Sequence, residues 1–493
     1  MKITNQFNKL KALCLLALAL SLGTQSCDKK IFDFPSRHEE AYINLDITDF
    51  GAVGDGITDD SEAVISAFET INANPELRYR LQFPEGTYPV NASVNASNVK
   101  IEGEGLLIPV AGSTSFILQI NGDNNVVKGL SFNEKTYCHI LLEVSGNDNT
   151  IDDCVFDRDT PPTGTTVYYS DKFIYLSDAK GTGNVIKNCK VNNGRTGIGL
   201  QGSSKLLDSE ISNCITGIIA SASTNHTEIA RNNIHDNNLN HASGADGILA
   251  SRNVSNLHIH HNTISNSGEH GIYFQGDSSV IENNEVFDNY GSGIKLASYN
   301  TGLYNHPDST YYIGHHNLVK NNVCYNNAAG GGTNAGVYLQ APLIDIVVTG
   351  NECYGNYIGI RSTSVSSISE DDPEYDQKTT LRQLLIANNH VYDDIDRSSL
   401  SIEGESQITI KDNEVDGILT NAKSPTHTID SALITGNKIN VALIINRATN
   451  CIITHNEINE LRVSSNSTRT PHVIQWNTIG ITNFAVDSTN TLL

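Results

Sequence analysis

A short pattern of apolar and polar positions returns along most of the chain. It consists of Asn, one variable residue and Ile or Val, then a few polar residues, then Gly-Ile at the start of an apolar strand. The asparagines that open it are Asn232, Asn262, Asn284, Asn321, Asn351, Asn389, Asn413, Asn437, Asn456 and Asn477. They lie 19 to 38 residues apart, and a repeat of this size that varies by insertion is typical of a solenoid. The pattern therefore predicts one stack of short parallel strands.

The repeated asparagines are expected to point into the solenoid. Stacked coils would place each amide beside the next, so the amides can bond to one another as asparagine ladders do in cross-β stacks. We interpret these residues as structural rather than catalytic.

Residues 45–90 do not follow the repeat. Val64, Phe68 and Ile71 are spaced for one apolar face of a helix, and Asp59 with Glu62 fits a capping box at its start. A strand and turn, Leu81-Gln82-Phe83-Pro84-Glu85-Gly86-Thr87-Tyr88, follow. A helix here would cover the open end of the solenoid, which otherwise exposes unpaired strand edges.

The motif DFGAVGDGITDD at residues 49–60, followed by the FPEGTY strand at 83–88, resembles the N-terminal segment of the pectate-lyase-like superfamily. That superfamily has a single-stranded right-handed β-helix and includes polygalacturonases, pectate lyases and epimerases. The resemblance implies an all-β fold, a right-handed parallel β-helix with an N-terminal capping helix. It is specific for the fold and leaves the reaction open, because hydrolases, lyases and epimerases share this architecture.

The N-terminus is typical of an export signal. Lys2, Lys9 and Lys11 precede the apolar residues 13–22, which are too few to span a bilayer. The small residue before Cys27 resembles the cleavage site of a bacterial lipoprotein. This implies a Bacteroidetes-type surface lipoprotein, lipidated at Cys27 and anchored to the outer membrane on its cell-surface or periplasmic face. Ordinary secretion stays open as the alternative.

These observations divide the chain into five segments. They are the signal peptide 1–27, a tether 28–44, the N-terminal cap 45–90, the coils 91–482 and a C-terminal tail 483–493. The net charge of -23 disfavours nucleic acid as a partner. We expect a monomer that meets an extracellular polysaccharide.

Seven cysteines remain after Cys27, an odd number without a CxxC spacing, so neither a full disulfide framework nor a zinc site is indicated. Cys154 and Cys189 fall where other coils place Asn. Cys353 falls where others place Ile or Val. The pattern predicts buried thiols stacked within the solenoid.

Candidate chemistry appears when the coils are aligned on the Gly before the inward Ile or Val. Two positions after this Gly the side chain should point outward, because strands alternate. The outward column reads Gly199, Ile219, Leu249, Tyr273, Lys295, Tyr338 and Arg361. Adding the neighbouring columns, the polar groups of the middle coils are Asp246, Glu269, His270, Tyr273, Lys295, Tyr338, Gln340 and Arg361. Since coils lie about 4.8 Å apart, these groups are expected to form one patch.

Long insertions flank this patch. They occupy residues 235–245 and 325–335 on the approach to the strands, and 299–316 and 364–380 on the exit. Long loops in a compact fold are often functional, so we expect them to wall a groove. Tyr299 and Tyr304 in one of them suit the apolar faces of sugars.

A glycoside hydrolase needs two carboxyl groups beside the bond that breaks, one to donate a proton and one to activate water or attack. Asp246 and Glu269, on adjacent coils, supply two such carboxyl groups. Lys295 and Arg361 would bind hydroxyls or a uronate, with Tyr273, Tyr338 and Gln340 as further contacts, and His270 would orient a neighbour. No cofactor or metal is required. Alternatively, Asp246 is a turn residue that accepts from backbone amides.

The strands also resemble those of polygalacturonases, in which Asn-Thr-Asp-Gly-Ile, Gly-Asp-Asp, Gly-His-Gly and Arg-Ile-Lys lie on successive coils. The resemblance implies a general-acid role for Asp246 and a water-binding role for Glu269. The departures are that Gly268-Glu269-His270-Gly271 replaces the paired aspartates, and that Gly293-Ile294-Lys295 is a displaced form of the last motif.

Two other functions fit the same residues. In a polysaccharide lyase, Lys295, or Tyr273 with His270, would remove the proton next to a uronate carboxylate. Arg361, or a Ca²⁺ ion held by Asp246 and Glu269, would neutralise that carboxylate. In a non-catalytic adhesin or glycan-binding β-helix, replacing Asp246 would leave function largely intact.

Overall fold

The computed structural model describes most of the chain beyond residue 41. The described residues are 42–113, 115–159, 162, 171–178, 181–237, 244–298, 314–332, 334–363, 381–396, 399–403, 406–421, 429–446, 448–463, 472–482 and 491–492. They belong to one compact unit, Tyr42–Leu493. Within the described part, no helix has the length and apolarity needed to cross a bilayer.

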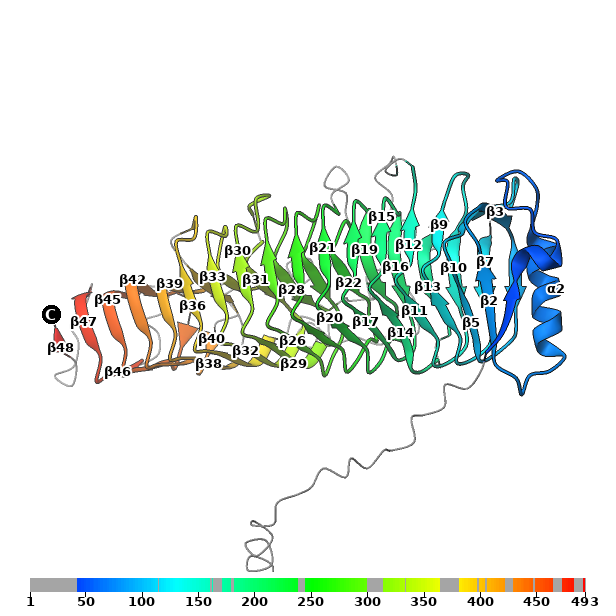
Figure 1. Cartoon of the computed structure of the whole chain (residues 1–493). Coiled ribbons are helices and arrows are strands. Elements are labelled where there is room, and N and C mark those ends of the chain that lie inside the picture. Colours follow the sequence, from blue (N-terminus) through cyan, green and yellow to red (C-terminus); the bar gives the residue numbers. More distant parts are fainter. Residues whose placement is uncertain are drawn as a thin grey trace, which may run out of the picture. The chain divides into compact units, whose positions relative to one another are not determined.

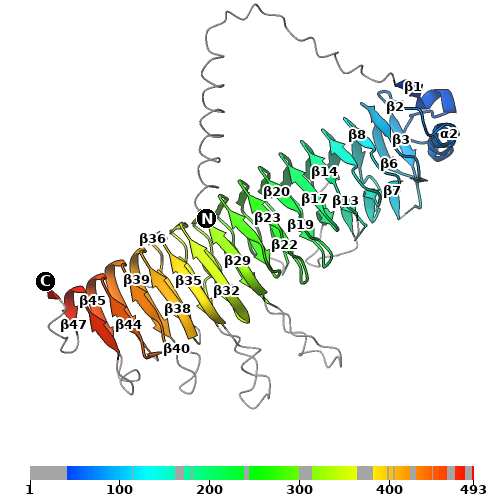
Figure 2. The same ribbon diagram turned by 90° about the horizontal axis from the view of Figure 1, so that it is seen from below.

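The unit is a stack of coils whose strands pair in parallel with those of the next coil. One face is a sheet of 19 described strands. Figure 2 shows strands of this sheet lying side by side. Its strands are β1 (Ile43–Asp46), β2 (Tyr79–Phe83), β5 (Val99–Gly103), β8 (Val126–Lys128), β11 (Thr150–Asp152), β14 (Asn184–Lys187), β17 (Ser204–Leu207), β20 (Glu228–Ala230), β23 (His258–His260), β26 (Val280–Glu282), β29 (Gly314–Lys320), β32 (Leu343–Thr349), β35 (Leu381–Ala387), β38 (Ser406–Lys411), β40 (Ile429–Asp430), β41 (Leu433–Thr435), β43 (Ala448–Thr449), β44 (Ile452–Thr454) and β46 (Val473–Gln475).

The remaining strands form two further runs along the stack (Figure 1). The first run is β3 (Thr87–Val90), β6 (Leu106–Pro109), β9 (Ser131–Asn133), β12 (Val155–Asp157), β15 (Lys190–Asn192), β18 (Glu210–Ser212), β21 (Asn233–His235), β24 (Thr263–Ser265), β27 (Glu285–Phe287), β30 (Val323–Tyr325), β33 (Glu352–Tyr354) and β36 (His390–Tyr392). The second, called the site face below, is β4 (Ala92–Val94), β7 (Phe116–Ile120), β10 (Ile140–Val144), β13 (Lys172–Leu176), β16 (Thr196–Leu200), β19 (Thr216–Ala220), β22 (Ile248–Ala250), β25 (Ile272–Phe274), β28 (Ile294–Ala297), β31 (Val337–Gln340), β34 (Ile360–Thr363) and β37 (Leu400–Glu403).

The two runs merge towards the C-terminus. There β39 (Glu414–Asn421) pairs with both β36 and β37, and it is followed by β42 (Lys438–Ile445), β45 (Glu457–Val463), β47 (Thr478–Thr482) and β48 (Thr491–Leu492). The pairing of β48 with β47 continues the stack into the segment expected as a tail. At the other end, β2 already pairs with β5, so the stack reaches into the segment expected as the cap.

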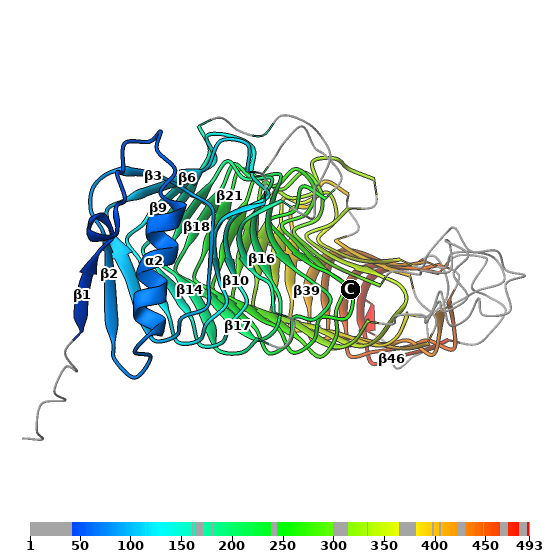
Figure 3. The same ribbon diagram turned by 90° about the vertical axis from the view of Figure 1, so that its right-hand side faces the viewer.

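A helix closes the N-terminal end of the stack, as predicted. Figure 3 shows α2 (Ser61–Asn72) lying across the first coils. Its residues Val64, Phe68 and Ile71 are buried. The capping box was wrong: the helix begins after Asp60, whose carboxylate instead accepts from the backbone of the preceding loop, at Val53 and Gly54. That loop follows a short 3-10 helix, η1 (Ile47–Phe50). The carboxylate thus ties the loop to the helix start.

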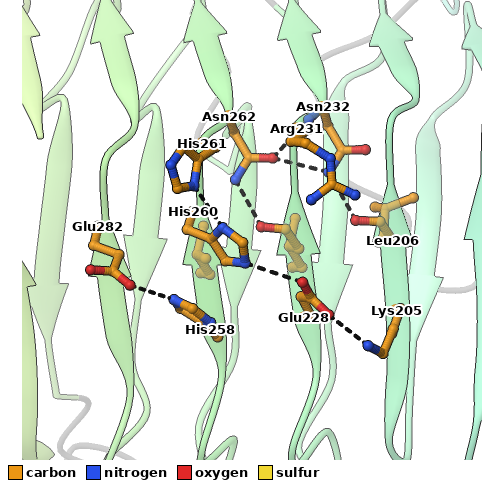
Figure 4. Close-up of polar contacts among 12 residues, drawn as sticks. Lys205, Leu206, Glu228, Arg231, Asn232, His258, His260, His261, Asn262 and Glu282 are labelled. Carbon is orange, nitrogen blue, oxygen red and sulfur yellow. Dashed lines mark hydrogen bonds and ion pairs between the residues drawn. The ribbon is translucent and has the colours of Figure 1, made fainter. Parts of the chain in front are cut away.

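An asparagine ladder runs through the later coils and confirms the repeat. Each backbone N–H donates to the side-chain Oδ1 of the next asparagine at 2.9 to 3.0 Å, as Figure 4 shows for Asn232 and Asn262. One member was misassigned: the ladder uses Asn322, whereas Asn321 has a left-handed backbone, with φ 54°. Two adjacent asparagines made these positions indistinguishable by spacing alone.

A second, shorter ladder lies at the corner before the site face and escaped the sequence pattern. It joins Asn289, Asn327 and Asn356 through backbone N–H to Oδ1 bonds of 3.0 to 3.2 Å, and it ends on the carboxylate of Asp394. It is only a few coils long, which explains why no regular spacing revealed it.

The recurrent Gly of the repeat has a packing cause. A Cβ atom added at Gly247 would lie 2.7 Å from the carbonyl oxygen of Gly271, and one at Gly271 would lie 2.7 Å from that of Gly293. Such contacts are too close for any side chain, so only Gly lets these coils approach. The described cysteines are buried and free, as expected, with Cys324 paired in register with Cys353.

Replacing Asn262 with Ala is expected to destabilise the fold. The change leaves the N–H of Asn232 and the carbonyl of Ile229 without their partners in the core. A buried polar group left unpaired costs about 1 to 3 kcal/mol. Chemical denaturation measures the loss. Asn233→Ala, at the neighbouring exposed position of β21, should leave the free energy of unfolding nearly unchanged; equal effects of the two changes would contradict the ladder's role.

Candidate active site

The strand register confirms the predicted alignment of the outward column on the site face. Tyr273 pairs with Leu249 on one side and with Lys295 on the other. Lys295 pairs with Tyr338, and Tyr338 pairs with Arg361. The register therefore places the candidate residues on adjacent coils, in the predicted order.

A cavity of about 650 Å³ opens on this face at coils β19 to β28. Four of the candidate residues line it: Asp246, Glu269, Tyr273 and Lys295. The other lining residues are Ala222, Gly244, Leu249, Ser251, Arg252, Asn253 and Gln275. The cavity thus collects two carboxyl groups, an amine and a phenol from three neighbouring coils.

Asp246 lies in the cavity wall and is fully buried. Its Oδ1 accepts from the backbone N–H of His270 at 2.9 Å. The alternative role predicted for Asp246, accepting from a backbone amide, therefore applies to this oxygen. Its Oδ2 is buried and has no hydrogen-bond partner among the described residues. Burial, and then the nearby Glu269 carboxylate, raise the pKa of Asp246 well above the ordinary aspartate value. Burial therefore favours the protonated form of this carboxyl group.

Glu269 occupies a different environment one coil away. Its side chain is 32% exposed. Its Oε2 accepts from the backbone N–H of Gly244, and its Oε1 lies 3.6 Å from Nε2 of His270. These contacts fix the orientation of a carboxyl group that remains open to the cavity.

His270 lies behind the cavity rather than in its lining. The backbone N–H of Ser292 donates to its Nδ1 at 2.9 Å, which assigns the proton of the neutral ring to Nε2. Burial, followed by the charge of Lys295, lowers the pKa of His270 well below its ordinary value. A neutral imidazole thus places its Nε2–H near the Glu269 carboxylate.

Lys295 is held between aromatic rings at the cavity. Its Nζ lies 4.8 Å from the centre of the Tyr273 ring, 5.4 Å from that of Tyr338 and 3.4 Å from Nε2 of His270. Burial lowers the pKa of Lys295, although Glu269 and Asp246 act in the opposite direction. The hydroxyl of Tyr273 accepts from Nε2 of Gln275 at 2.7 Å. These contacts fix the position of the Lys295 amine, and burial removes part of its hydration.

Three predicted substrate contacts lie outside the cavity lining. Tyr338 is buried, and its hydroxyl shares a 2.7 Å hydrogen bond with Oγ1 of Thr363. Arg361 donates from Nη1 to the carbonyl of Gly332 at 3.0 Å. Gln340 pairs in register with Thr363, away from the carboxyl groups. Alternation predicted the outward direction of Tyr338 and Arg361 but not the burial of Tyr338.

Other sequence expectations lie outside the described residues. These are Tyr299, Tyr304 and the lipidation site Cys27, together with most of the 299–316 and 364–380 insertions. Conversely, Arg252 lines the cavity and was not predicted. It belongs to the turn after β22, where the only available signal was a basic residue beyond an aligned strand.

A metal site is not indicated here. Among the described residues, no three His, Cys, Asp or Glu side chains converge as metal ligands. A Ca²⁺ ion takes six to eight oxygen ligands, usually ionised carboxylates. Asp246 fits this poorly, because it is buried, favours its protonated form and already bonds to a backbone amide. No Ca²⁺ step is derived from these residues.

A further group of charged side chains lies on the opposite 19-stranded sheet (Figure 4). Glu228 bonds to Lys205 and His260, and Glu282 bonds to His258. Each carboxylate is thus paired with neighbouring side chains on the surface, at a distance from the cavity.

Known families match two parts of the chain. Residues 43–155 match a family model described as rhamnogalacturonase A/epimerase, pectate lyase-like. Residues 174–309 match the model of a right-handed β-helix region. No curated protein matches the chain significantly.

Solved structures share the architecture at low identity. One is the Dettilon tailspike protein (TM-score 0.44, 17% identity, 91% of this chain and 68% of that one). Another is the catalytic unit of a GH87 α-1,3-glucanase from Streptomyces thermodiastaticus (TM-score 0.43, 12% identity, 91% and 69%). A third is the A-module of the Azotobacter vinelandii mannuronan C-5 epimerase AlgE4 (TM-score 0.29, 14% identity, 91% and 97%). Likeness at this level carries no argument about the reaction. The capped parallel coils and the two family matches identify the chain as a right-handed parallel β-helix protein, and its residues 43–155 are similar to the pectate-lyase-like superfamily.

Proposed function

We propose that this protein is a carbohydrate-active enzyme that hydrolyses glycosidic bonds in a polysaccharide. The single observation behind the proposal is a cavity whose wall holds two carboxyl groups in unlike environments. Asp246 is buried and favours its acid form, whereas Glu269 is open to the cavity and held by a backbone amide. Two titratable groups in contrasting environments are the usual basis for assigning an acid and its partner.

In the proposed reaction Asp246 donates its proton to the glycosidic oxygen as the bond from that oxygen to the sugar carbon breaks. Glu269 either takes a proton from the attacking water or attacks the sugar carbon itself. His270 keeps Glu269 oriented through its Nε2–H, and Tyr273 and Lys295 contact the sugar. The family model matched by residues 43–155 is named for rhamnogalacturonase A and an epimerase, which supports a polysaccharide substrate.

A second candidate, β-elimination, rests on Lys295. Its pKa is lowered by burial, and it lies against Tyr273 in the same cavity. A desolvated amine of this kind can remove the proton next to a uronate carboxylate. The product would carry a carbon–carbon double bond, which absorbs ultraviolet light.

A digest of neutral and uronate polysaccharides separates the two reactions. Each sample is assayed for new reducing ends and for ultraviolet absorbance, with and without a chelator. Reducing ends without absorbance support hydrolysis, whereas absorbance that rises with cleavage would replace it by β-elimination. Binding without cleavage of any polymer would favour a glycan-binding protein.

Replacing Lys295 with Met is expected to move the alkaline limb of the pH profile of kcat/KM to higher pH. The ammonium group lowers the pKa of Asp246, so its loss should let Asp246 keep its proton at higher pH. The measurement is kcat/KM against pH for both proteins. Loss of all activity, with no residual profile, would point to Lys295 as the base of an elimination.

The proposed setting is outside the cytoplasm. The signal-like residues 1–27, with Cys27 as a lipid acceptor, support export and anchoring to the outer membrane. There the protein, which we expect to be a monomer, would meet extracellular polysaccharide. Metabolic labelling with a fatty acid tests this. Label should enter the protein and be lost in Cys27→Ser.

A further inference from the structure

A cluster of polar and aromatic side chains lies on earlier coils, outside the cavity. Tyr137 and His139 precede β10, Asp171 precedes β13 and Arg195 precedes β16. None of these residues takes part in the proposed reaction. Tyr137 and His139 lie at the surface, where their side chains are 43% and 41% exposed, and Asp171 is buried beneath them.

The two exposed rings are held in one arrangement. Nδ1 of His139 lies 2.6 Å from Oδ1 of Asp171, and the hydroxyl of Tyr137 lies 3.2 Å from both Asp171 oxygens and 2.9 Å from the same Nδ1. The rings meet edge to face, with centres 5.0 Å apart and planes at 74°. Since Nδ1 faces Asp171, Nε2 is the nitrogen of His139 that a ligand can reach.

Paired charges beneath the rings make this support rigid. The guanidinium of Arg195 lies 5.0 Å from the centre of the Tyr137 ring, and its Nη1 lies 3.3 Å from Oδ2 of Asp171. The carboxylate of Glu134 is almost fully buried and pairs with Arg158. It also accepts from the backbone N–H of Cys138, the residue between Tyr137 and His139 in the sequence. A paired and hydrogen-bonded network of this kind fixes a surface feature before any ligand arrives.

The cluster lies on the same side of the stack as the cavity. The register places Arg195 in the column that continues through Ile215 and Ala245 to Glu269. Three coils separate Arg195 from Glu269, which corresponds to about 14 Å along the axis. Ile215 and Ala245 are buried, so the cluster and the cavity are separate from each other on one face.

We propose that Tyr137 and His139 form a second sugar-binding site, which holds the same polysaccharide a few rings away from the bond that is cleaved. A half-exposed phenol offers an apolar surface with a polar rim, as sugars require. The exposed imidazole nitrogen supplies a hydrogen-bonding group whose position Asp171 fixes. The proposal rests on the proposed function for the identity of the ligand.

The test compares long and short substrates. Tyr137→Ala and His139→Asn are each expected to lower kcat/KM on a polymer by about tenfold, because each variant loses one aromatic or polar contact with the sugar. The same changes should leave kcat/KM unchanged on oligosaccharides too short to reach both the cavity and the cluster. Tyr137→Phe keeps the ring and should retain most of the activity on the polymer. The matched control is His226→Asn, an exposed histidine elsewhere with a left-handed backbone that Asn tolerates.

Two results would overturn the inference: equal losses on short and long substrates, which indicate damage to the fold or cavity, or no loss on either. If the wild-type chain cleaves no polymer, the proposed function fails by itself. Retardation of the whole chain in gels that contain each polysaccharide then tests the second site alone. Weaker retardation of Tyr137→Ala supports the site, and unchanged retardation of this variant overturns it.

Discussion

Replacing Asp246 with Asn is expected to lower kcat for polysaccharide cleavage by roughly a hundredfold to ten-thousandfold, the usual contribution of a general acid. The substitution keeps the size of the side chain and the oxygen that accepts from the N–H of His270. It removes only the proton that burial retains on this carboxyl group. The fold should therefore be intact, which thermal unfolding would verify.

The role of Asp246 as an acid has a specific signature. A substrate with an activated aryl leaving group needs little protonation, so Asp246→Asn should recover much of its activity on it. Glu269→Gln should not recover, because its proposed role concerns water or the sugar carbon. Asp288→Asn, at an exposed position, is the control for the change from carboxyl to amide. Equal losses of Asp246→Asn on activated and natural substrates would contradict the assignment.

Replacing Asp394 with Asn is expected to stabilise the protein at and above neutral pH. Asp394 ends the second asparagine ladder, where its Oδ1 accepts from the N–H of Asn356 at 3.1 Å. In Asn356 the side-chain Nδ2 donates to the carbonyls of Cys324 and Tyr354. At the matching place in the ladder, Asp394 has the carboxylate oxygen Oδ2 instead of a donor. This oxygen is buried, and the Ser399 side chain lies nearby. Asn would supply the missing donor.

The pH dependence follows from the sign of the shift. Burial raises the pKa of Asp394 from 3.8 to about 8, so the folded protein retains a proton that the unfolded chain loses. Stability should therefore fall as pH rises from about 4 to about 8, by at most roughly 6 kcal/mol, and then level off. In Asp394→Asn this dependence should disappear, with the gain largest at pH 8 and small at pH 4.

Denaturation at several pH values measures this effect. Asp393→Asn changes the neighbouring exposed carboxyl group at a left-handed position that Asn tolerates, and it should keep the wild-type dependence. If Asp394→Asn and Asp393→Asn behaved alike, the ladder would not be the source of the pH dependence.

The repeat predicted the fold in some detail. Alternation and the recurrent Gly-Ile gave the correct register for Tyr273, Lys295 and Tyr338, because strand spacing and period are local properties of the backbone. The errors were local too. Asn321 and Asn322 are adjacent, and only the left-handed φ of Asn321 decides which one enters the ladder.

The site was predicted only in part. Register alone brings Asp246 and Glu269 onto neighbouring coils, so the sequence could propose them as a pair. It did not predict that Asp246 is buried while Glu269 is open, nor that Tyr338 is covered and Arg252 lines the cavity. Burial of an outward side chain depends on segments that cross the coil from elsewhere in the chain.

By itself, the sequence determined the stack of parallel coils, the capping helix, the inward ladder and the order of the outward side chains. These features repeat from coil to coil, so each is specified by a short stretch of residues. Only the tertiary structure decided which outward side chains meet in a cavity, which carboxyl group is buried and which exposed rings are held by buried charges. Solvent exposure and electrostatic environment depend on atoms brought together from distant coils, and no local pattern encodes them.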